Sequence, residues 1–236
     1  MSLLTDVQEF CRRTGLDVPV SLVSSSDKQA LQLWGLANEI CTDLVTRFQW
    51  QDLTEQCTFT SIAAENQGAV ATLASSGFLS IIDETIYDRT LRIPIFGPLN
   101  NTQWQARQAL PATGPIYQYR IRSGHLYFNP AIPAGHTIAF EYKTKNIVVA
   151  VDGVTYQELF QADTDSLRLP STLLTAGLRW MWKKEKGLEY GEELAAYERL
   201  VANLSAHDGG RRTLNAADRY NDFKPAIVVP LGNWNT

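Results

Sequence analysis

Asp163 and Asp165 form the acidic pair in this chain whose spacing is most suited to chemistry. Two carboxylates two residues apart can share a divalent cation, or can supply the acid and the base of a cell-wall hydrolase. The segment lacks the later glycine and glutamate of an EF-hand loop. We therefore favour a solvated turn leading into residues 167–170, and we keep cell-wall hydrolysis as an alternative function.

The three histidines, His125, His136 and His207, stand in separate sequence contexts. None belongs to an H-E-x-x-H motif or has a cysteine at metal-ligand spacing, so we expect no metal. The sequence also contains no G-x-S-x-G nucleophile elbow and no P-loop. We therefore predict no catalytic residue and no cofactor, and we expect each histidine at the surface or on a strand.

The three cysteines, Cys11, Cys41 and Cys57, include no C-x-x-C pair. Their odd number, and the helical pattern around the first two, favour buried reduced thiols over a disulfide framework. The N-terminus does not resemble a signal peptide. These features predict a chain made in a reducing cytoplasm.

Several aromatic residues could line a sugar-binding face: Trp50, Trp104, Tyr117, Tyr119, Tyr127 and Tyr142. Aromatic side chains at alternating strand positions are more often part of a core, so we place them there first. Glycan binding remains an alternative.

Charge and hydropathy limit the possible partners. The net charge of −4 argues against a protein that coats nucleic acid. Arg211 and Arg212 could meet phosphate, but two arginines are weak evidence on an acidic background. No stretch approaches the roughly 20 apolar residues of a membrane span, so we expect no membrane association.

The first fifty residues predict two helices. The first presents one apolar face and ends at Thr14-Gly15; that face holds Leu4, Val7, Phe10 and Cys11. Asp27 is the predicted N-cap of a longer helix that runs to about Phe48 or Trp50. Its predicted apolar positions are Leu31, Trp34, Cys41, Leu44, Val45 and Phe48.

The middle of the chain changes to β periodicity. Alternation at 57–62, 85–87, 117–121 and 137–142 predicts strands. Two prolines confine 92–99 to a sheet edge or a loop, and a short helix is expected between Asn101 and Leu110, capped by Asn101 or Thr102. Ser123-Gly124 predicts a turn between strands, and Asp152-Gly153 predicts a two-residue hairpin turn with positive φ at both positions.

The segment from Pro170 to Gly210 predicts a second helical region. Ser171 is the predicted N-cap of a helix with a stripe at Leu174, Leu178 and Met181. Gly187 then separates it from a helix whose apolar face is Leu194, Tyr197, Val201 and Leu204. We expect Trp34, Phe48, Leu178 and Met181 to be largely buried where the two helical regions meet.

Together these elements predict an α+β protein. N- and C-terminal helices form a helical-bundle body, 1–56 and 157–210, with an antiparallel β-rich region, 57–156, inserted between them. Residues 211–236 form an extended tail with little periodicity. Within it we predict partner-binding residues at Arg211, Arg212, Tyr220, Phe223, Ile227, Val228, Val229 and Trp234. Pro225 and Pro230 favour an extended course, and Ile227–Val229 could add as a strand to a sheet edge.

Two successions of residues carry a resemblance to a known family. The first is Arg92-Ile-Pro-Ile-Phe-Gly-Pro-Leu99, Trp104, Tyr117-Gln-Tyr-Arg-Ile121, Asn129-Pro130, Ala134-Gly-His-Thr-Ile138 and Phe140-Glu-Tyr142. The second is Phe160-Gln-Ala-Asp163-x-Asp165, Leu169-Pro170, Gly177-Leu-Arg-Trp180 and Trp182-Lys-Lys-x-Lys-Gly187-Leu-x-Tyr190. Together they resemble the bacteriophage head-to-tail adaptors, including those called head completion proteins or tail tubular protein A. The resemblance covers most of residues 1–208, and its motifs are structural strings rather than a catalytic signature.

The resemblance implies a non-enzymatic virion protein at the head-to-tail junction. Such adaptors form a homo-oligomeric ring, usually of twelve copies, between the portal protein and a downstream tail or nozzle protein. DNA would pass through the lumen without sequence-specific binding, and a mildly acidic wall would let the duplex slide. A heterologous ring uses two different surface patches per subunit, which a helical face and a β insertion can supply.

Overall fold

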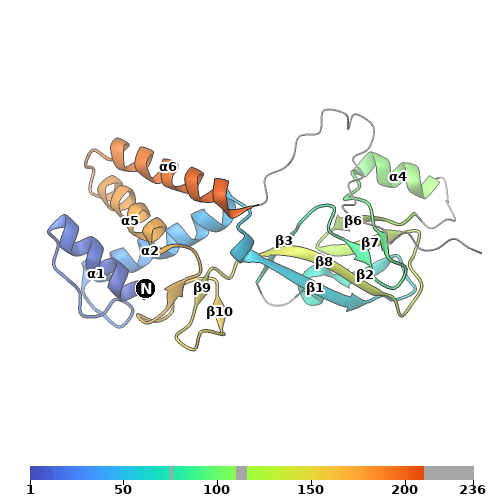
Figure 1. Cartoon of the computed structure of the whole chain (residues 1–236), viewed down its shortest axis with the longest axis horizontal. Helices are drawn as coiled ribbons and strands as arrows, with labels where there is room; N and C mark the ends of the chain where they lie inside the picture. Colours follow the sequence, from blue (N-terminus) through green and yellow to red (C-terminus); the bar gives the residue numbers. More distant parts are fainter. Residues whose placement is uncertain (75–76, 110–115, 210–236) are drawn as a thin grey trace, which may run out of the picture.

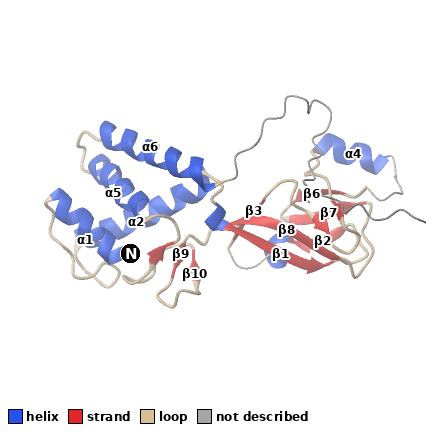
Figure 2. Cartoon of the chain, in the orientation of Figure 1, coloured by secondary structure: helices blue, strands red, loops and turns tan. Residues whose placement is uncertain are grey.

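The computed structural model describes residues 1–74, 77–109 and 116–209, and shows an α+β chain with antiparallel sheets (Figures 1 and 2). The helices are α1 (Leu3–Thr14), α2 (Lys28–Arg47), α3 (Val70–Leu73), α4 (Asn101–Ala109), α5 (Ser171–Glu185) and α6 (Gly191–Asp208). A 3-10 turn, η1 (Gln51–Leu53), follows α2. The strands are β1 (Thr54–Thr60), β2 (Asn66–Ala69), β3 (Phe78–Ile81), β4 (Tyr87–Asp88), β5 (Ile93–Pro94), β6 (Gln118–Arg122), β7 (His125–Asn129), β8 (Thr137–Thr144), β9 (Val148–Val149), β10 (Tyr156–Gln157) and β11 (Ser166–Leu167).

Helix α1 forms as predicted. Ser2 caps its N-terminus by accepting a hydrogen bond from the Thr5 amide, and Gly15 ends it with a left-handed φ of 70°. Val7, Phe10 and Cys11 are buried. The apolar side of α1 therefore faces the interior of the helical part of the chain.

Helix α2 is capped by Asp27, as predicted, whose carboxylate accepts from the Ala30 amide at 3.2 Å. The predicted apolar face is wrong at Leu31, which is 41% exposed. The buried stripe instead follows the positions Ala30, Leu33, Leu36, Ala37, Ile40, Cys41, Leu44 and Val45. Leu31 lies beside this stripe because helical positions separated by one or two residues do not share a face.

Helices α5 and α6 pack on each other as a helical hairpin. Leu178 and Met181 are buried as expected, whereas Trp34 and Phe48 are only half-buried at the margin of the same cluster. Ser171 is the first helical residue and not the N-cap, because the carbonyl of Pro170 already accepts the first helical hydrogen bond, from the Leu173 amide at 3.0 Å. The face of α6 includes buried Tyr197 and Val201.

The β-rich part contains two of the three sheets. One has the strand order β1-β8-β4-β5, with β3 also paired to β8, and the other has the order β2-β7-β6. Strand β5 lies at a sheet edge, as the two prolines predict. Ser123-Gly124 forms the predicted turn between β6 and β7, and the two residues have φ values of 51° and 74°.

Two predictions about local structure in this region are wrong. The cap of α4 is Asn100, because Asn100 Oδ1 accepts from the Gln103 amide at 2.8 Å and Gln103 Oε1 accepts from the Asn100 amide. The β9–β10 hairpin exists, but Ala150 N donates to Thr155 O, so its loop is longer than two residues. Asp152 does not have positive φ; its carboxylate accepts from the Val154 and Thr155 amides and closes a wider turn.

The buried side chains form two separate cores. One gathers α1, α2, α5 and α6 and also includes Ile147, Val148 and Phe160 from the segment around β9. The other gathers side chains of the β1-β8-β4-β5 and β2-β7-β6 sheets and includes Tyr119, Phe128 and Phe140. The two groups of elements occupy opposite ends of the molecule and meet near η1 (Figure 1). The proposed boundaries at 57, 157 and 211 remain predictions.

Candidate functional site

The predicted partner-binding residues, from Arg211 to Trp234, lie outside the described residues. The structure therefore places none of them. The remaining candidates are the acidic pair, the histidines, the aromatic residues and the thiols, and each has a position in the described part of the chain.

The acidic pair lies at a turn, as predicted, but Asp165 is buried and not solvated, and both carboxylates clamp the backbone. Asp163 Oδ1 accepts from the Leu22 and Val23 amides at 3.0 and 2.9 Å. Asp165 is 2% exposed, and its Oδ2 accepts from the Gln161 and Ala162 amides, both at 2.8 Å. Main-chain carbonyls of the same loop accept from the Leu3 and Leu4 amides at the start of α1.

This clamp explains why the chain has an acidic residue at each of the two positions. Backbone amides at a turn are obligatory donors, and a carboxylate can accept several of them at once. Asp163 accepts from amides of residues 22–23 and Asp165 from amides of residues 161–162, so the two carboxylates hold different parts of the backbone. No group of three or more His, Cys, Asp or Glu side chains within residues 1–74, 77–109 and 116–209 is arranged to hold a metal ion.

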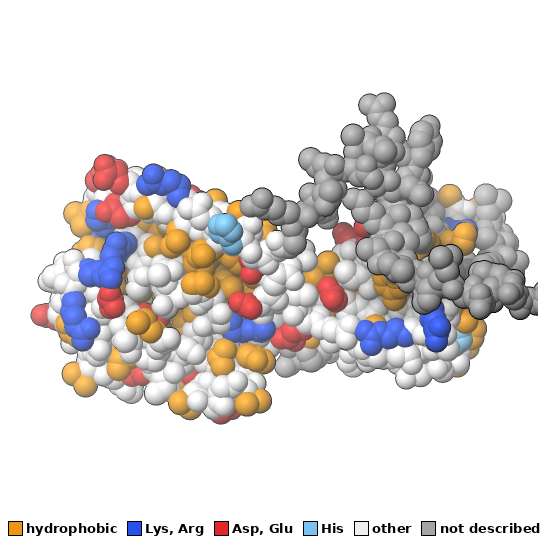
Figure 3. Space-filling model, viewed as in Figure 1, with side chains coloured by type: hydrophobic (Ala, Val, Ile, Leu, Met, Phe, Trp, Pro, Cys, Tyr) orange, Lys and Arg blue, Asp and Glu red, His pale blue; other side chains and the backbone are white. Residues whose placement is uncertain are grey.

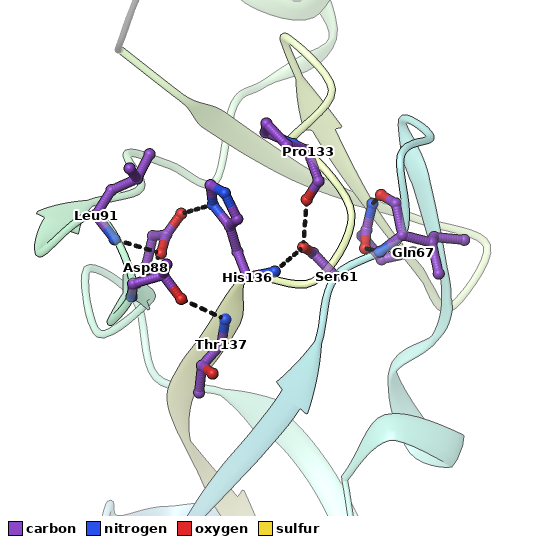
Figure 4. Close-up of polar contacts among 9 residues, drawn as sticks. Ser61, Gln67, Asp88, Leu91, Pro133, His136 and Thr137 are labelled. Atoms are coloured by element: carbon purple, nitrogen blue, oxygen red, sulfur yellow. Dashed lines mark hydrogen bonds and ion pairs between the residues drawn. The ribbon is translucent and has the colours of Figure 1, made fainter.

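A polar cluster at the end of β1 has the residue types of a catalytic triad but not its geometry (Figure 4). His136 Nδ1 lies 2.7 Å from Asp88 Oδ2. The Ser61 hydroxyl donates to the Pro133 carbonyl at 2.6 Å and accepts from the main-chain amide of His136 at 3.0 Å. A nucleophilic serine needs its hydroxyl on the imidazole, and here that hydroxyl is occupied by backbone groups.

Asp88 is the buried centre of this cluster. It is fully buried, and its Oδ1 accepts from the Thr90 and Leu91 amides at 2.8 and 3.0 Å. The carboxylate thus joins the turn after β4 to the histidine directly before β8. A buried carboxylate is tolerated when each oxygen has donors, and Asp88 meets this condition.

Gln67 organises the neighbouring loop in the same way. Its side-chain amide donates to the Ile62 carbonyl at 3.0 Å and to that of Ala64 at 2.5 Å. Its Oε1 accepts from the Ile62 amide at 2.9 Å. In Figure 4 these contacts lie beside those of Ser61, so side chains from several segments together fix the loops at the far end of β1.

Sequence reasoning missed the Asp88–His136 pair. The two residues are 48 positions apart, and neither belongs to a local motif. The only available signal was an acidic residue directly after the alternating run 85–87, which a strand-edge position explains equally well.

The other two histidines lie apart from this cluster. His125 Nδ1 is 3.3 Å from Asn66 Oδ1 on the neighbouring strand, and His207 is exposed near the end of α6. The prediction of surface or strand positions is confirmed for both.

The aromatic residues mostly fill cores, as predicted first. Trp50, Tyr119 and Tyr142 are almost fully buried, and Trp104 is 5% exposed. Trp104 contacts half-buried Tyr127 edge to face, with ring centroids 6.3 Å apart. Aromatic side chains that are buried in this way do not present their ring faces to a sugar.

The three cysteines are free and buried, as predicted. Burial raises the pKa of the Cys41 thiol to about 12, and burial also raises the pKa of Cys11 and Cys57. Thiols with raised pKa values remain protonated at neutral pH and are poor nucleophiles. These residues act as small core side chains.

A pocket of about 560 Å³ is lined by residues of β1, β4 and β8 and of the segments next to β4. Its lining carries both signs of charge, from Glu84, Asp88, Arg89, Arg92 and Glu141. Glu84 and Arg92 have φ values of 65° and 60°, so two of these five residues have left-handed backbone. Mixed charge of this kind suits contact with another protein surface better than capture of a single charged ligand.

The exposed charges of the helical end are also mixed. On the face shown in Figure 3, cationic and anionic side chains alternate instead of gathering into a patch. Several are paired, such as Arg47 with Asp43 at 2.7 Å.

None of the described helices is long and apolar enough to cross a membrane.

Comparison of the sequence with models of known protein families and with curated proteins finds no match.

Proposed function

We propose that this chain is a structural virion protein: a head-to-tail adaptor that forms a homo-oligomeric ring, with twelve copies as the expected number. In this proposal the ring joins the portal protein to a downstream tail or nozzle protein, and DNA passes through its lumen. The protein is made in the host cytoplasm and is incorporated at the head-to-tail junction. The helices near the two ends of the described chain form a bundle that is the body of the ring.

The observation that carries this proposal is the location of the family-like strings within the fold. Phe140-Glu-Tyr142 lies in the central strand β8, and Gly177-Leu-Arg-Trp180 lies where α5 packs on α2. Asp163-x-Asp165 is a backbone clamp. These strings therefore determine architecture, which favours a structural role over catalysis.

Two further features support a ring subunit. The two cores lie at different ends of the molecule, so each can present its own contact surface. A head-to-tail ring requires two different patches on each copy. The net charge of −4 is compatible with a channel wall that does not retain DNA.

The tail 211–236 is the proposed docking arm of this assembly. Our test compares the full chain with a chain ending at Gly210 for attachment to purified portal rings of the virus that encodes the protein. We expect weak or absent attachment of the shorter chain, with its far-ultraviolet circular dichroism retained. A Trp234→Ala full-length variant tests whether apolar anchoring, and not tail length alone, is responsible.

Electron microscopy of purified particles decides the main proposal. We expect density for this chain as a ring between the portal and the tail. A chain that is absent from particles and stays monomeric beside portal rings would refute the proposal, whatever the role of the tail.

A further inference from the structure

Within the described part of the chain, strand β1 has one edge without a partner strand, which we call its open edge. It is the end strand of its sheet and pairs, among the described residues, only with β8. The strand is seven residues long, and Figure 1 shows it along the outside of the β-rich part. A long end strand with unpaired backbone groups is a template for another strand.

The hydrogen bonds of β8 show which groups of β1 point to this edge. The Thr137 and Glu141 carbonyls accept from Arg89 and Ile82, on the side of β8 away from β1. Because antiparallel pairs alternate, their partners Thr60 and Gln56 direct their own backbone groups away from β8. Thr58, midway between them, does the same. Cys57 and Phe59 instead point their amides toward β8.

The side chains at the open edge leave room for a partner strand. Gln56, Thr58 and Thr60 are exposed. Threonine is a good strand former, and this edge lacks the lysine or proline with which many proteins block an end strand.

The last described helix, α6, ends next to the start of β1, and residues 210–236 follow it in the sequence. Asp208, the last residue of α6, accepts a hydrogen bond from the Gln51 amide at 2.7 Å. Gln51 begins η1, which leads directly into β1. The end of α6 and the start of β1 therefore lie side by side (Figure 1).

Residues 226–229 are the part of 210–236 whose residue types best suit a strand paired with the open edge of β1. Ile227, Val228 and Val229 are β-branched, and Pro225 and Pro230 bound them, which limits a strand to this short run. Residues 210–225 can span up to about 55 Å, whereas β1 is about 23 Å long. We propose that residues 226–229 pair with the open edge of β1 in the same chain.

Pairing within one chain is favoured over pairing between copies. A tether of this length keeps the segment near the edge at an effective concentration of the order of millimolar. A second copy would need a comparable protein concentration to compete. The pairing concerns the isolated chain and does not depend on the proposed function.

Residue-resolved amide hydrogen exchange of the full-length protein tests the proposal. We expect at least one of the outward amides of Gln56 and Thr58 to be protected in the natural sequence. In the full-length Val228→Pro variant, it should exchange at least about tenfold faster. The Leu214→Pro variant, which alters the same segment outside residues 226–229, should match the natural sequence.

The inward amides of Cys57 and Phe59 report folding in every sample, and they should stay protected in both variants. Unprotected outward amides in the natural sequence would overturn the proposal, as would protection that survives Val228→Pro. Protection that rises with protein concentration would also overturn the proposal, because it would show that β1 pairs with a second copy of the chain.

Discussion

At the scale of single residues, the buried carboxyl of Asp6 makes stability depend on pH. It is 2% exposed on α1, and its Oδ2 has no hydrogen-bond partner among the described residues. Burial raises the pKa of the carboxyl from 3.8 to about 6, partly offset by the amino terminus. The folded state therefore binds a proton in a pH range where the unfolded chain does not.

The sign of this effect makes a prediction. The contribution of Asp6 to the free energy of unfolding is most favourable below 3.8, the pKa of the carboxyl in the unfolded chain. It is lost as the pH rises through about 6, the pKa in the folded state. We expect Asp6→Asn to stabilise the protein by about 1–3 kcal/mol near neutral pH, and the gain to vanish near pH 4. Urea unfolding at several pH values measures it. Glu9→Gln, at a more exposed position on the same helix, should show no such pH-dependent gain.

Asp88 gives the opposite prediction, because its burial is compensated. Asp88→Ala would leave the Thr90 and Leu91 amides and the His136 imidazole without their acceptor. We expect a loss of about 2–4 kcal/mol in unfolding free energy. Asp152→Ala removes a carboxylate that also accepts two turn amides, but at the surface. It should cost much less, and equal losses would contradict the role of burial.

At the scale of elements, the contact between α2 and α5 depends on a glycine. A Cβ on Gly177 would lie 2.9 Å from Ile40 Cδ1 and 3.0 Å from its Cγ1, and Ile40 is fully buried. The two helices can approach this closely only because position 177 has no side chain. Helix propensity alone would favour alanine there.

Gly35, within α2, supplies the matched control. A Cβ there would meet nothing within 4 Å, so Gly35→Ala should stabilise the helix by about 0.5–1 kcal/mol. Gly177→Ala should be less stable than Gly35→Ala by about 1–3 kcal/mol, because overpacking opposes the gain in propensity. Thermal melts of both variants measure the difference. Equal melting temperatures would show that the helices separate without cost.

At the scale of the whole molecule, Arg168 joins the helical end to the β-rich end. Its guanidinium donates to the Asp52 carbonyl in η1, to the Asn146 carbonyl at 3.0 Å, and to Glu55 Oε1 at 3.3 Å. It also lies over the Tyr156 ring, 4.4 Å from the centroid. One side chain thus contacts both chain segments that connect the two cores.

We therefore expect Arg168→Ala to loosen the junction more than either core. Amides of 51–55 and 146–148 should exchange faster, and unfolding free energy should fall by about 2–4 kcal/mol. Arg199→Ala, on the exposed face of α6, is the control for loss of an arginine. Unchanged exchange at the junction would show that the backbone crossings alone hold the two ends together.

Several helices, strands and turns of this protein could be predicted from the sequence, because they depend on interactions between neighbouring residues. Helical spacing, an Asp27 cap and a Gly15 stop depend on neighbours within a few residues, so α1 and α2 could be placed. The alternation of Ile138, Phe140 and Tyr142 likewise placed β8 and its buried face. The Ser123-Gly124 turn follows from conformations that few residues adopt readily.

Contacts between distant segments were decided only by the tertiary structure. Asp163 carries no local sign that its carboxylate would accept from the amides of Leu22 and Val23, and Asp88 meets His136 across 48 positions. Leu31 is hydrophobic yet exposed, because α2 packs on α5 with the neighbouring stripe of residues that includes Leu33 and Ile40. Residue type and spacing determine which elements form, whereas packing of those elements determines which polar groups are buried and which face each helix hides.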